Sequence, residues 1–495
     1  MLLARWRDHG VRGLQGRLTD ETATQALHRL TSYEPGREWT DTIDDPRIVR
    51  DLEVNDFERY PWPYKRYEQD LPRLELPSEL PTTAVSALSV LAGAAQPAGA
   101  ELDLAQLARL LFFSAGVVRT AESRGRTILF RAAGSAGARH PFEVYVAVPE
   151  GSALPPGVHW YHPEEHALFQ AGPAPAAEAP AIVLTGVPWR TGWRYRERGY
   201  RHIYWDTGTL LSQLLALASS AGLDARLFTR FPDAVIDAVV GADGVDEFAT
   251  VVVALGSGEP SLEPSGEAAA GTIDADPLEF PLVTAAQRAG ILEAWGSAWP
   301  AGDRVEAPDL GPTVEEVVLR RSSQRRMDPE RDLPRSVLAT SIGVAMRGID
   351  VPHWVAVHGV EGVEPGMYRW PDLSNPVRSG NLRDELFRVV LDQGLARDAA
   401  FVVVSAIDTG GLDDRGYREA QLAAGLVEGR LHLAAYAQDA SASGMTFLDS
   451  EIASLVGEPV DGLLFTCVGV PDNTVKRGGL PGSPTPIRPV TPRLD

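Results

Sequence analysis

One segment of the chain recurs further along it, and this repeat constrains the fold more than any other feature. The tetrapeptide Arg198-Gly199-Tyr200-Arg201 returns unchanged as Arg415-Gly416-Tyr417-Arg418. Each copy is followed by the pattern of a long helix, a glycine-containing turn, an acidic helix start (Asp233, Asp449) and a strand ending in glycine. The chain therefore uses one α/β unit twice. We expect the two units to pair about a pseudo-twofold axis, as a homodimer fused into one chain would.

Hydrophobic periodicity and turn residues divide the chain around this repeat. Residues 1–75 are polar and irregular and form an N-terminal arm with one helix over 19–30. We expect a first domain over 76–256, a linker and helix over 257–310, and a second domain over 311–495. The patterns predict helices at 102–116, 207–221, 284–295 and 313–321, and strands at 142–148, 181–186 and 249–255.

Composition excludes several classes of function. The net charge is −21, which argues against a nucleic-acid partner bound through a general positive field. Cys467 is the single cysteine and lies in an apolar run, so we expect a buried thiol and no metal site. No apolar run is long enough for a signal peptide or a membrane span, so we expect a cytoplasmic protein.

The first copy contains a loop of small residues, 134–138 (Gly-Ser-Ala-Gly-Ala), directly before the strand at 142–148. Its glycines let backbone approach a flat or phosphorylated ligand, because no Cβ stands in the way. The hydroxyl of Ser135 can donate or accept a hydrogen bond. Taken alone, such a loop is more often a tight turn.

The second copy contains basic clusters where the first has none. Residues 320–326 read Arg-Arg-Ser-Ser-Gln-Arg-Arg, and Lys476-Arg477 follow the last strand. Guanidiniums and hydroxyls near a helix end suit a phosphate, although a solvated basic face has the same composition. The second copy lacks a counterpart of the small-residue loop, since 346–350 lead almost directly into the next strand. Each copy has lost what the other keeps, which predicts one complete site between the halves and a defective pseudo-symmetric mate.

These residues together resemble the FMN-dependent nitroreductase superfamily, and within it the SagB/ThcOx-type azoline dehydrogenases. The resemblance covers most of residues 25–480. It rests on the loop and strand at 135–146, on Trp193-Arg194-Tyr195 with the repeated Arg-Gly-Tyr-Arg, on Ser323-x-Arg325, and on Gly469-Val470-Pro471. It implies an α+β fold of two fused nitroreductase-like domains, each with a central, mostly antiparallel sheet flanked by helices.

The resemblance also implies FMN as cofactor, held between the two halves. The residues that would hold its phosphate and ribityl side are Arg321, Ser323, Arg325, Lys476 and Arg477. Those that would line the isoalloxazine ring are Ser135, Gly137 and Ala138, with Ser443 and Gly444 as further candidates at the ring.

The azoline dehydrogenases have a Lys-Tyr pair thought to act in proton removal, and the matching positions here read Arg194-Tyr195. Arginine cannot serve as the base. Tyr195 could take the proton if its pKa were lowered, which a nearby guanidinium such as Arg194 favours. Alternatively, Trp193 and Tyr195 are packing aromatics and Arg194 is an interface cation. His140, directly after the loop, is a candidate substrate contact, although such a histidine is more often structural.

The implied function is oxidation of a thiazoline or oxazoline to an azole on a peptide substrate, with electrons passed to dioxygen. A cyclodehydratase complex that makes the azoline is an implied partner, and further oligomerisation of the fused chain stays open. Two alternatives remain. One is an FMN oxidoreductase acting on another small-molecule or carrier-bound intermediate, and the other is a flavin-free scaffold of a peptide-modifying complex.

Overall fold

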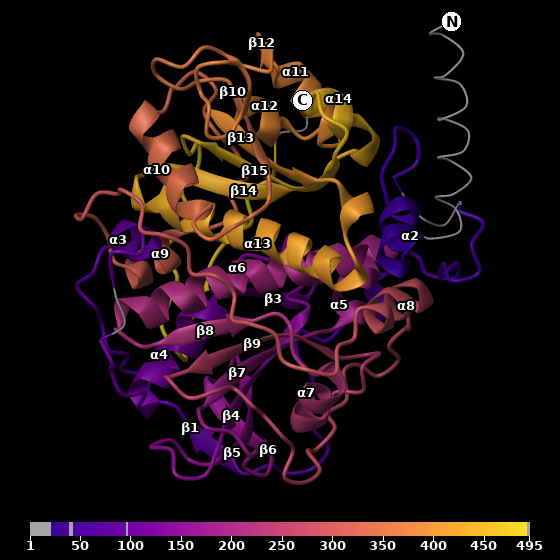
Figure 1. The fold of residues 1–495 in the computed structure, drawn as a ribbon, viewed down its shortest axis with the longest axis vertical. Helices are drawn as coiled ribbons and strands as arrows, with labels where there is room; N and C mark the ends of the chain where they lie inside the picture. The colour runs from indigo at the N-terminus through magenta and orange to yellow at the C-terminus, as the bar shows by residue number, and fades with distance from the viewer. Residues whose placement is uncertain (1–20, 39–42, 96–97, 493–495) are drawn as a thin grey trace, which may run out of the picture.

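The computed structural model describes residues 21–38, 43–95 and 98–492, and Figure 1 shows them as two halves stacked on each other. The first half lies at the bottom of the view and the second half at the top. Helices α6 (Gly199–Ser220) and α13 (Asp414–Ala437) run side by side between the two halves. Each of these helices follows the strand at the centre of its own half.

The first half is built on a seven-stranded sheet in the order β1-β6-β5-β4-β7-β9-β8, in which every neighbouring pair is antiparallel. Its central strands β4 and β7 are buried on both faces, so they read as apolar runs rather than as alternating patterns. The strands are β1 (Arg73–Glu75), β4 (Phe142–Val148), β5 (Gly157–His162), β6 (Ala167–Gly172), β7 (Ala181–Gly186), β8 (Ala225–Phe228) and β9 (Phe248–Leu255).

The second half repeats this arrangement in a six-stranded antiparallel sheet of order β12-β11-β10-β13-β15-β14. Strand β13 has the central place that β7 has in the first sheet, as the sequence repeat predicts. The strands are β10 (His353–Val357), β11 (Gly366–Arg369), β12 (Arg378–Ser379), β13 (Phe401–Ile407), β14 (Ser441–Met445) and β15 (Asp461–Gly469). The predicted α+β fold with mostly antiparallel sheets is confirmed.

A third, small sheet joins distant parts of the chain. Strands β2 (Val117–Ser123) and β3 (Arg126–Arg131) form a hairpin, and β16 (Thr485–Pro486) pairs with β2 in parallel. The C-terminal segment of the second half is therefore attached to the first half.

The remaining helices flank the sheets. They are α2 (Ala23–Leu30), α3 (Ala87–Leu91), α4 (Leu104–Ala115), α5 (Pro188–Tyr195), α7 (Asp233–Val240), α8 (Pro281–Ala289), α9 (Val314–Arg320), α10 (Arg335–Ala345), α11 (Arg383–Val389), α12 (Gly394–Asp398) and α14 (Ile452–Val456). The predicted helix limits differ most from the observed ones at the start of α6 and the end of α8. Helix α6 starts at Gly199, before the leucine-rich stretch, and α8 ends at Ala289, because Gly290 ends the turn well before Trp295.

The two long helices touch backbone to backbone at a pair of equivalent glycines. A Cβ on Gly208 would lie 2.5 Å from the carbonyl carbon of Gly425, and one on Gly425 would lie 2.4 Å from the Trp205 carbonyl oxygen. Only glycine permits this approach. Gly208 and Gly425 have the same position relative to the repeated tetrapeptide, so the contact joins equivalent positions of the two halves, as a pseudo-twofold arrangement requires.

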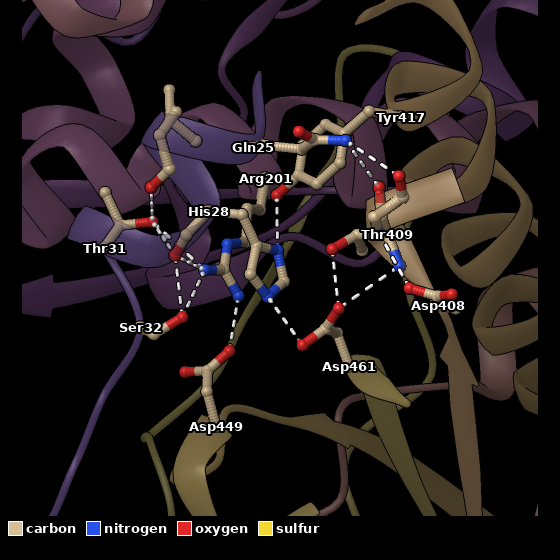
Figure 2. A network of polar contacts seen from close by, with 12 residues as sticks. Gln25, His28, Thr31, Ser32, Arg201, Asp408, Thr409, Tyr417, Asp449 and Asp461 are labelled. Carbon is tan, nitrogen blue, oxygen red and sulfur yellow. Dashed lines mark hydrogen bonds and ion pairs between the residues drawn. The ribbon is translucent and has the colours of Figure 1, made fainter. Parts of the chain in front are cut away.

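The repeated tetrapeptide makes reciprocal ion pairs across the same interface. Arg198 and Arg201 each donate to Asp449 of the second half at 2.6 Å, and Figure 2 shows the Arg201 contact. In return, Arg415 and Arg418 lie 2.7 and 3.3 Å from Asp233 of the first half. Each copy therefore binds the acidic helix start of the other copy.

Helices α2 and α8 take equivalent places beside these ion pairs. Arg201 donates to the His28 carbonyl oxygen of α2 at 2.8 Å, and Arg418 donates to the Gln287 carbonyl oxygen of α8. His28 in turn lies 3.0 Å from the Tyr417 hydroxyl (Figure 2). The repeat thus extends into segments that the sequence suggested as arm and linker, and the domain limits at 75, 256 and 310 stay a prediction.

Candidate functional site

The small-residue loop is held by helix α6 of its own half. Ser135 donates from Oγ to Asp206 Oδ2 at 2.5 Å, and the Ala136 amide donates to Asp206 Oδ1 at 3.1 Å. Thr209, one turn further along α6, donates to the Gly134 carbonyl oxygen at 2.7 Å. The Ser135 hydroxyl also accepts from the His140 amide at 2.7 Å. These bonds fix the loop backbone, so Ser135 acts here first as a structural anchor.

The other side of the loop lies against Arg194 and Tyr195 at the end of α5. Gly137 has φ of 60°, in the left-handed region that favours glycine. A Cβ there would also lie 2.8 Å from Arg194 Cδ and 2.9 Å from the Tyr195 hydroxyl. The loop therefore reaches the proposed catalytic pair only because position 137 has no side chain.

The structure brings the loop next to the basic cluster of the other half. A Cβ on Gly134 would lie 3.6 Å from Arg321 Nη2 and 4.0 Å from Ser323 Oγ. Arg321 is buried, and its Nη1 donates to the Ala132 carbonyl oxygen at the base of the loop. Its Nε has no hydrogen-bond partner. A guanidinium from the second half thus faces a glycine cradle of the first half, with a donor to spare.

Arg119 links both basic clusters of the second half to the hairpin. It donates from Nη1 to the Arg321 carbonyl oxygen at 3.1 Å and from Nε to the Lys476 carbonyl oxygen at 2.7 Å. Lys476 and Arg477 are exposed. Their backbone therefore lies on the same side of the molecule as the Arg321 backbone, as the sequence predicts.

Ser443 and Gly444 lie in strand β14, and the carboxyl group of Glu428 from α13 packs against them. A Cβ on Gly444 would lie 2.2 Å from Glu428 Oε1. Burial raises the pKa of Glu428 to about 7, against the opposing effect of Arg321. Burial also raises the pKa of Asp206 well above its ordinary value, with Glu428 adding to the shift. Two carboxyl groups, one from each half, therefore favour their neutral forms beside the cradle.

The Tyr195 ring stacks on His202, with centroids 4.1 Å apart and an angle of 9° between the planes. Arg194 donates to the side chain of Asn55 in the N-terminal arm at 3.2 Å. The electrostatic influence of Tyr195 and Arg194 on Arg325 shows that Arg325, from the second half, lies near this pair. Arg325 itself is exposed.

His140 is buried behind the loop, with both ring nitrogens lacking a hydrogen-bond partner. Burial, followed by the charges of Arg131 and Arg139, lowers the pKa of His140 well below its ordinary value. The ring contacts Phe142 edge-on at 5.8 Å. The imidazole is thus neutral, and a role in substrate binding stays a proposal.

The pseudo-symmetric mate of the site differs at every key position. The spacing that relates Arg198 to Arg415 puts Leu412 in the place of Tyr195 and Ala423 in the place of Asp206. Both residues line a cavity of about 760 Å³ between the halves, which the linker residues Ser297–Pro300 also line. Arg347, from the counterpart of the loop, donates to the Leu91 carbonyl oxygen at 2.9 Å and lies against Gly93.

Three residues of the site escaped the sequence prediction: Asp206, Glu428 and His202. Asp206 and His202 are four residues apart on α6 and therefore share a face, which is a signal that the sequence did contain. Glu428 had no such signal, because its place depends on how strand β14 lies against α13.

None of the helices in residues 21–38, 43–95 and 98–492 is long and apolar enough to span a membrane. Over the same ranges, no group of three or more His, Cys, Asp or Glu side chains is arranged to hold a metal ion.

Known proteins support this architecture. No family model matches the chain. The trifolitoxin-processing protein TfxF of Rhizobium leguminosarum bv. trifolii is 32% identical over 136 residues, which are 27% of this chain and 50% of TfxF. TfxB of the same organism is 28% identical over 236 residues, which are 42% of this chain and 63% of TfxB. The chain thus spans less than two thirds of either relative.

Among solved structures, a candidate nitroreductase from Anabaena variabilis ATCC 29413 superposes with a TM-score of 0.70. It is 24% identical and covers 91% of this chain and 100% of its own, so the likeness shows a shared fold over both halves. The chain therefore has the nitroreductase-like fold over both halves, and its sequence similarity to TfxF and TfxB covers part of each of those proteins.

Proposed function

We propose that the chain is an FMN-dependent oxidoreductase that dehydrogenates an azoline ring on a peptide substrate. The observation that carries the proposal is the meeting of Gly134 and Arg321, which come from opposite halves. A loop of small residues with glycine at 134 and 137, beside a buried guanidinium with an unused donor, fits the phosphate-bearing, flat shape of FMN.

The candidate residues divide by position around this cradle. Arg321, Ser323 and Arg325 would hold the phosphate and ribityl side, with Lys476 and Arg477 adding charge from the same half. Ser135, Gly137 and Ala138 would lie over the isoalloxazine ring, and Ser443 and Gly444 on β14 would contact it. Asp206 would keep the loop in place through Ser135 and Ala136.

Oxidation of an azoline to an azole removes one proton and one hydride equivalent from the ring. When bound, FMN would supply the hydride acceptor and pass the two electrons on to dioxygen. Tyr195 would take the ring proton on its hydroxyl oxygen. To do so, Tyr195 would have to be a phenolate, which becomes the neutral phenol when it takes the proton. Arg194, whose guanidinium lies 5.7 Å from the Tyr195 ring centroid, and Arg325 would place positive charge near that phenolate.

The peptide substrate is proposed from the relatives. TfxB and TfxF are trifolitoxin-processing proteins, and the azoline dehydrogenases that the chain resembles act on ring-containing peptides. A cyclodehydratase that forms the azoline would be the partner. Because Arg194 stands here in place of the lysine and arginine cannot serve as a base, Tyr195 is the proposed acceptor of the proton.

The test is a spectrum followed by turnover. We expect the purified protein to show flavin absorbance, and Tyr195→Phe to keep that absorbance while losing roughly a hundredfold or more of the oxidation of azoline-containing peptides. Tyr64→Phe, which removes only a hydroxyl bonded to Glu164 away from the site, is the control. A colourless protein that takes up no added FMN would support a scaffold, and full activity of Tyr195→Phe would remove Tyr195 from the mechanism.

A further inference from the structure

Four arginines follow one edge of the candidate site and have no carboxylate partner. They are Arg124, Arg126, Arg139 and Arg194, which we call the arginine arc. In the part of the chain that the structure describes, none of the four forms an ion pair, unlike Arg198, Arg201 and Arg415 between the halves. Arg124, Arg126 and Arg194 are exposed.

The arc is continuous in space. Arg194 touches the loop at Gly137, and Arg139 donates from Nε to the Gly137 carbonyl oxygen at 3.2 Å. The Arg139 guanidinium lies 4.5 Å from the ring centroid of Tyr60. Arg126 lies 5.2 Å from the same ring on the hairpin side. A line of positive charge thus runs from the proposed catalytic pair to the tip of the β2–β3 hairpin.

Aromatic side chains of the N-terminal arm orient the outer part of this line. Arg124 lies 4.3 Å from the ring centroid of Phe57, and Arg126 donates to the Phe57 carbonyl oxygen at 2.8 Å. Phe57 and Tyr60 in turn pack on Trp193, at 5.6 and 5.1 Å between centroids. Guanidiniums that already pack on aromatic faces lose little conformational entropy when they bind an anion, so they are preorganised for anion binding.

The charge of the arc contrasts with that of the whole molecule. The chain has a net charge of −21, and the arm and hairpin contribute carboxylates such as those of Asp56 and Glu122 that are engaged in local hydrogen bonds. Asp56 caps the Glu58 amide at 2.9 Å, and Glu122 accepts from Thr127 at 2.7 Å. Cations without carboxylate partners in an acidic protein concentrate positive potential along this edge of the candidate site.

We propose that the arginine arc binds a carboxylate-rich segment of the peptide substrate and guides its ring toward Tyr195. Guanidiniums bind carboxylates by paired, charge-assisted hydrogen bonds, and an arc this long suits an extended chain rather than a small molecule. The inference rests on the proposed function, since it names the substrate class of the same site.

The experiment uses two synthetic peptides, one of alternating Glu and Gly and one with Gln in place of each Glu, titrated calorimetrically into the full-length protein. We expect the Glu peptide to bind at least about tenfold more tightly, with a preference that weakens as salt rises. The double variant R124E/R126E should abolish the preference. The control R331E/R335E changes the net charge equally at exposed arginines beside and within α10 and should retain it.

Equal binding of both peptides, binding of neither, or an unchanged preference in R124E/R126E overturns the arginine arc as a binding surface. Flavin absorbance of the same samples tests the proposed function separately, because Arg124 and Arg126 lie outside the FMN cradle. A flavin-containing protein without peptide preference would therefore contradict only the arc.

Discussion

Arg321 differs from the surface arginines because its guanidinium is buried and one donor is unused. Burial lowers its pKa, and among residues 21–38, 43–95 and 98–492 no carboxylate forms an ion pair with it. A buried cation without a counter-ion is costly to the fold unless a ligand supplies the negative charge. Its neighbour Arg320 is exposed and paired with Asp439 at 2.5 Å. Of these two adjacent arginines, Arg321 therefore faces the candidate site and Arg320 lies at the surface.

We expect Arg321→Ala to weaken FMN binding by about 1.5–3 kcal/mol, or roughly tenfold to a hundredfold in Kd, because a charge-assisted hydrogen bond is lost. Fluorescence titration of the flavin-stripped protein with FMN measures this. Arg320→Ala removes only a surface ion pair and should leave the Kd within about twofold. Equal effects of both substitutions would place the phosphate elsewhere.

Glu428 makes the stability of the protein depend on pH. Its pKa in the folded protein is about 7, above the ordinary 4.5, so its neutral form is favoured. The stability that it contributes is fully present below pH 4.5 and is lost as pH rises through about 7. Over that window the free energy of unfolding should fall by at most about 3 kcal/mol.

Glu428→Gln removes this dependence, so the variant should be more stable than the wild type above pH 7 and equal to it in acid. Urea unfolding at several pH values measures the difference. Glu361→Gln, on an exposed turn, is the control and should follow the wild type throughout. A variant with the wild-type pH dependence would contradict the burial of this carboxyl group.

At the scale of elements, the contact between α6 and α13 brings the two halves together. The helices meet at Gly208 and Gly425, and the tetrapeptides at their first turns bind Asp449 and Asp233 reciprocally. Burial alone would raise the pKa of Asp449, but Arg198 and Arg201 outweigh it and lower the pKa to about 2. The pairs of Asp449 with Arg198 and Arg201 therefore persist well below neutral pH.

We expect Gly208→Ala to destabilise the protein by about 1–3 kcal/mol, because the added Cβ would lie 2.5 Å from the backbone of Gly425. Gly343→Ala, at a helical glycine of α10 with no atom within 4 Å, is the matched control. It should stabilise by up to about 1 kcal/mol through helix propensity. The urea midpoints of unfolding of the two variants measure these changes in stability. A Gly208→Ala variant as stable as the wild type would mean that the two helices cross elsewhere.

At the scale of the whole molecule, one duplicated unit gives two unequal sites. The candidate site has Tyr195, Asp206 and the basic cluster, while its mate has Leu412, Ala423 and a linker packed into it. Trp299 of that linker donates to the Gly348 carbonyl oxygen at 3.1 Å, and Val305 donates to the Ala92 carbonyl oxygen at 3.0 Å. A fused chain permits this asymmetry, because each half mutates independently.

The purified protein should therefore contain one FMN per chain, measured as flavin absorbance against protein concentration. Arg347→Ala, which removes the guanidinium that lies against Gly93, should leave the ratio at one, because the cavity of the mate is lined by Arg230 together with the carboxylates of Asp350, Asp413 and Glu419. A ratio of two in the wild type would show that the mate also binds flavin.

The sequence by itself determined the elements and the duplication. Strands 142–148 and 181–186 have the predicted bounds because they are buried runs of β-branched and apolar residues between turn residues. It also pointed to Arg321 and the small-residue loop, since each copy lacks what the other has. Helix starts were less predictable. The first turn of α6 depends on ion pairs of Arg198 and Arg201 with Asp449, which is remote in the sequence.

Only the tertiary structure decided which groups meet. Asp206 acquires its role by accepting from the loop, Glu428 by packing under Gly444, and the arginine arc by stacking on an arm more than 60 residues away. These relations depend on distances between segments remote in the chain, and local propensity contains no information about such distances. The physical reason is that periodicity reports which face of an element is buried, whereas packing alone selects the partner on that face.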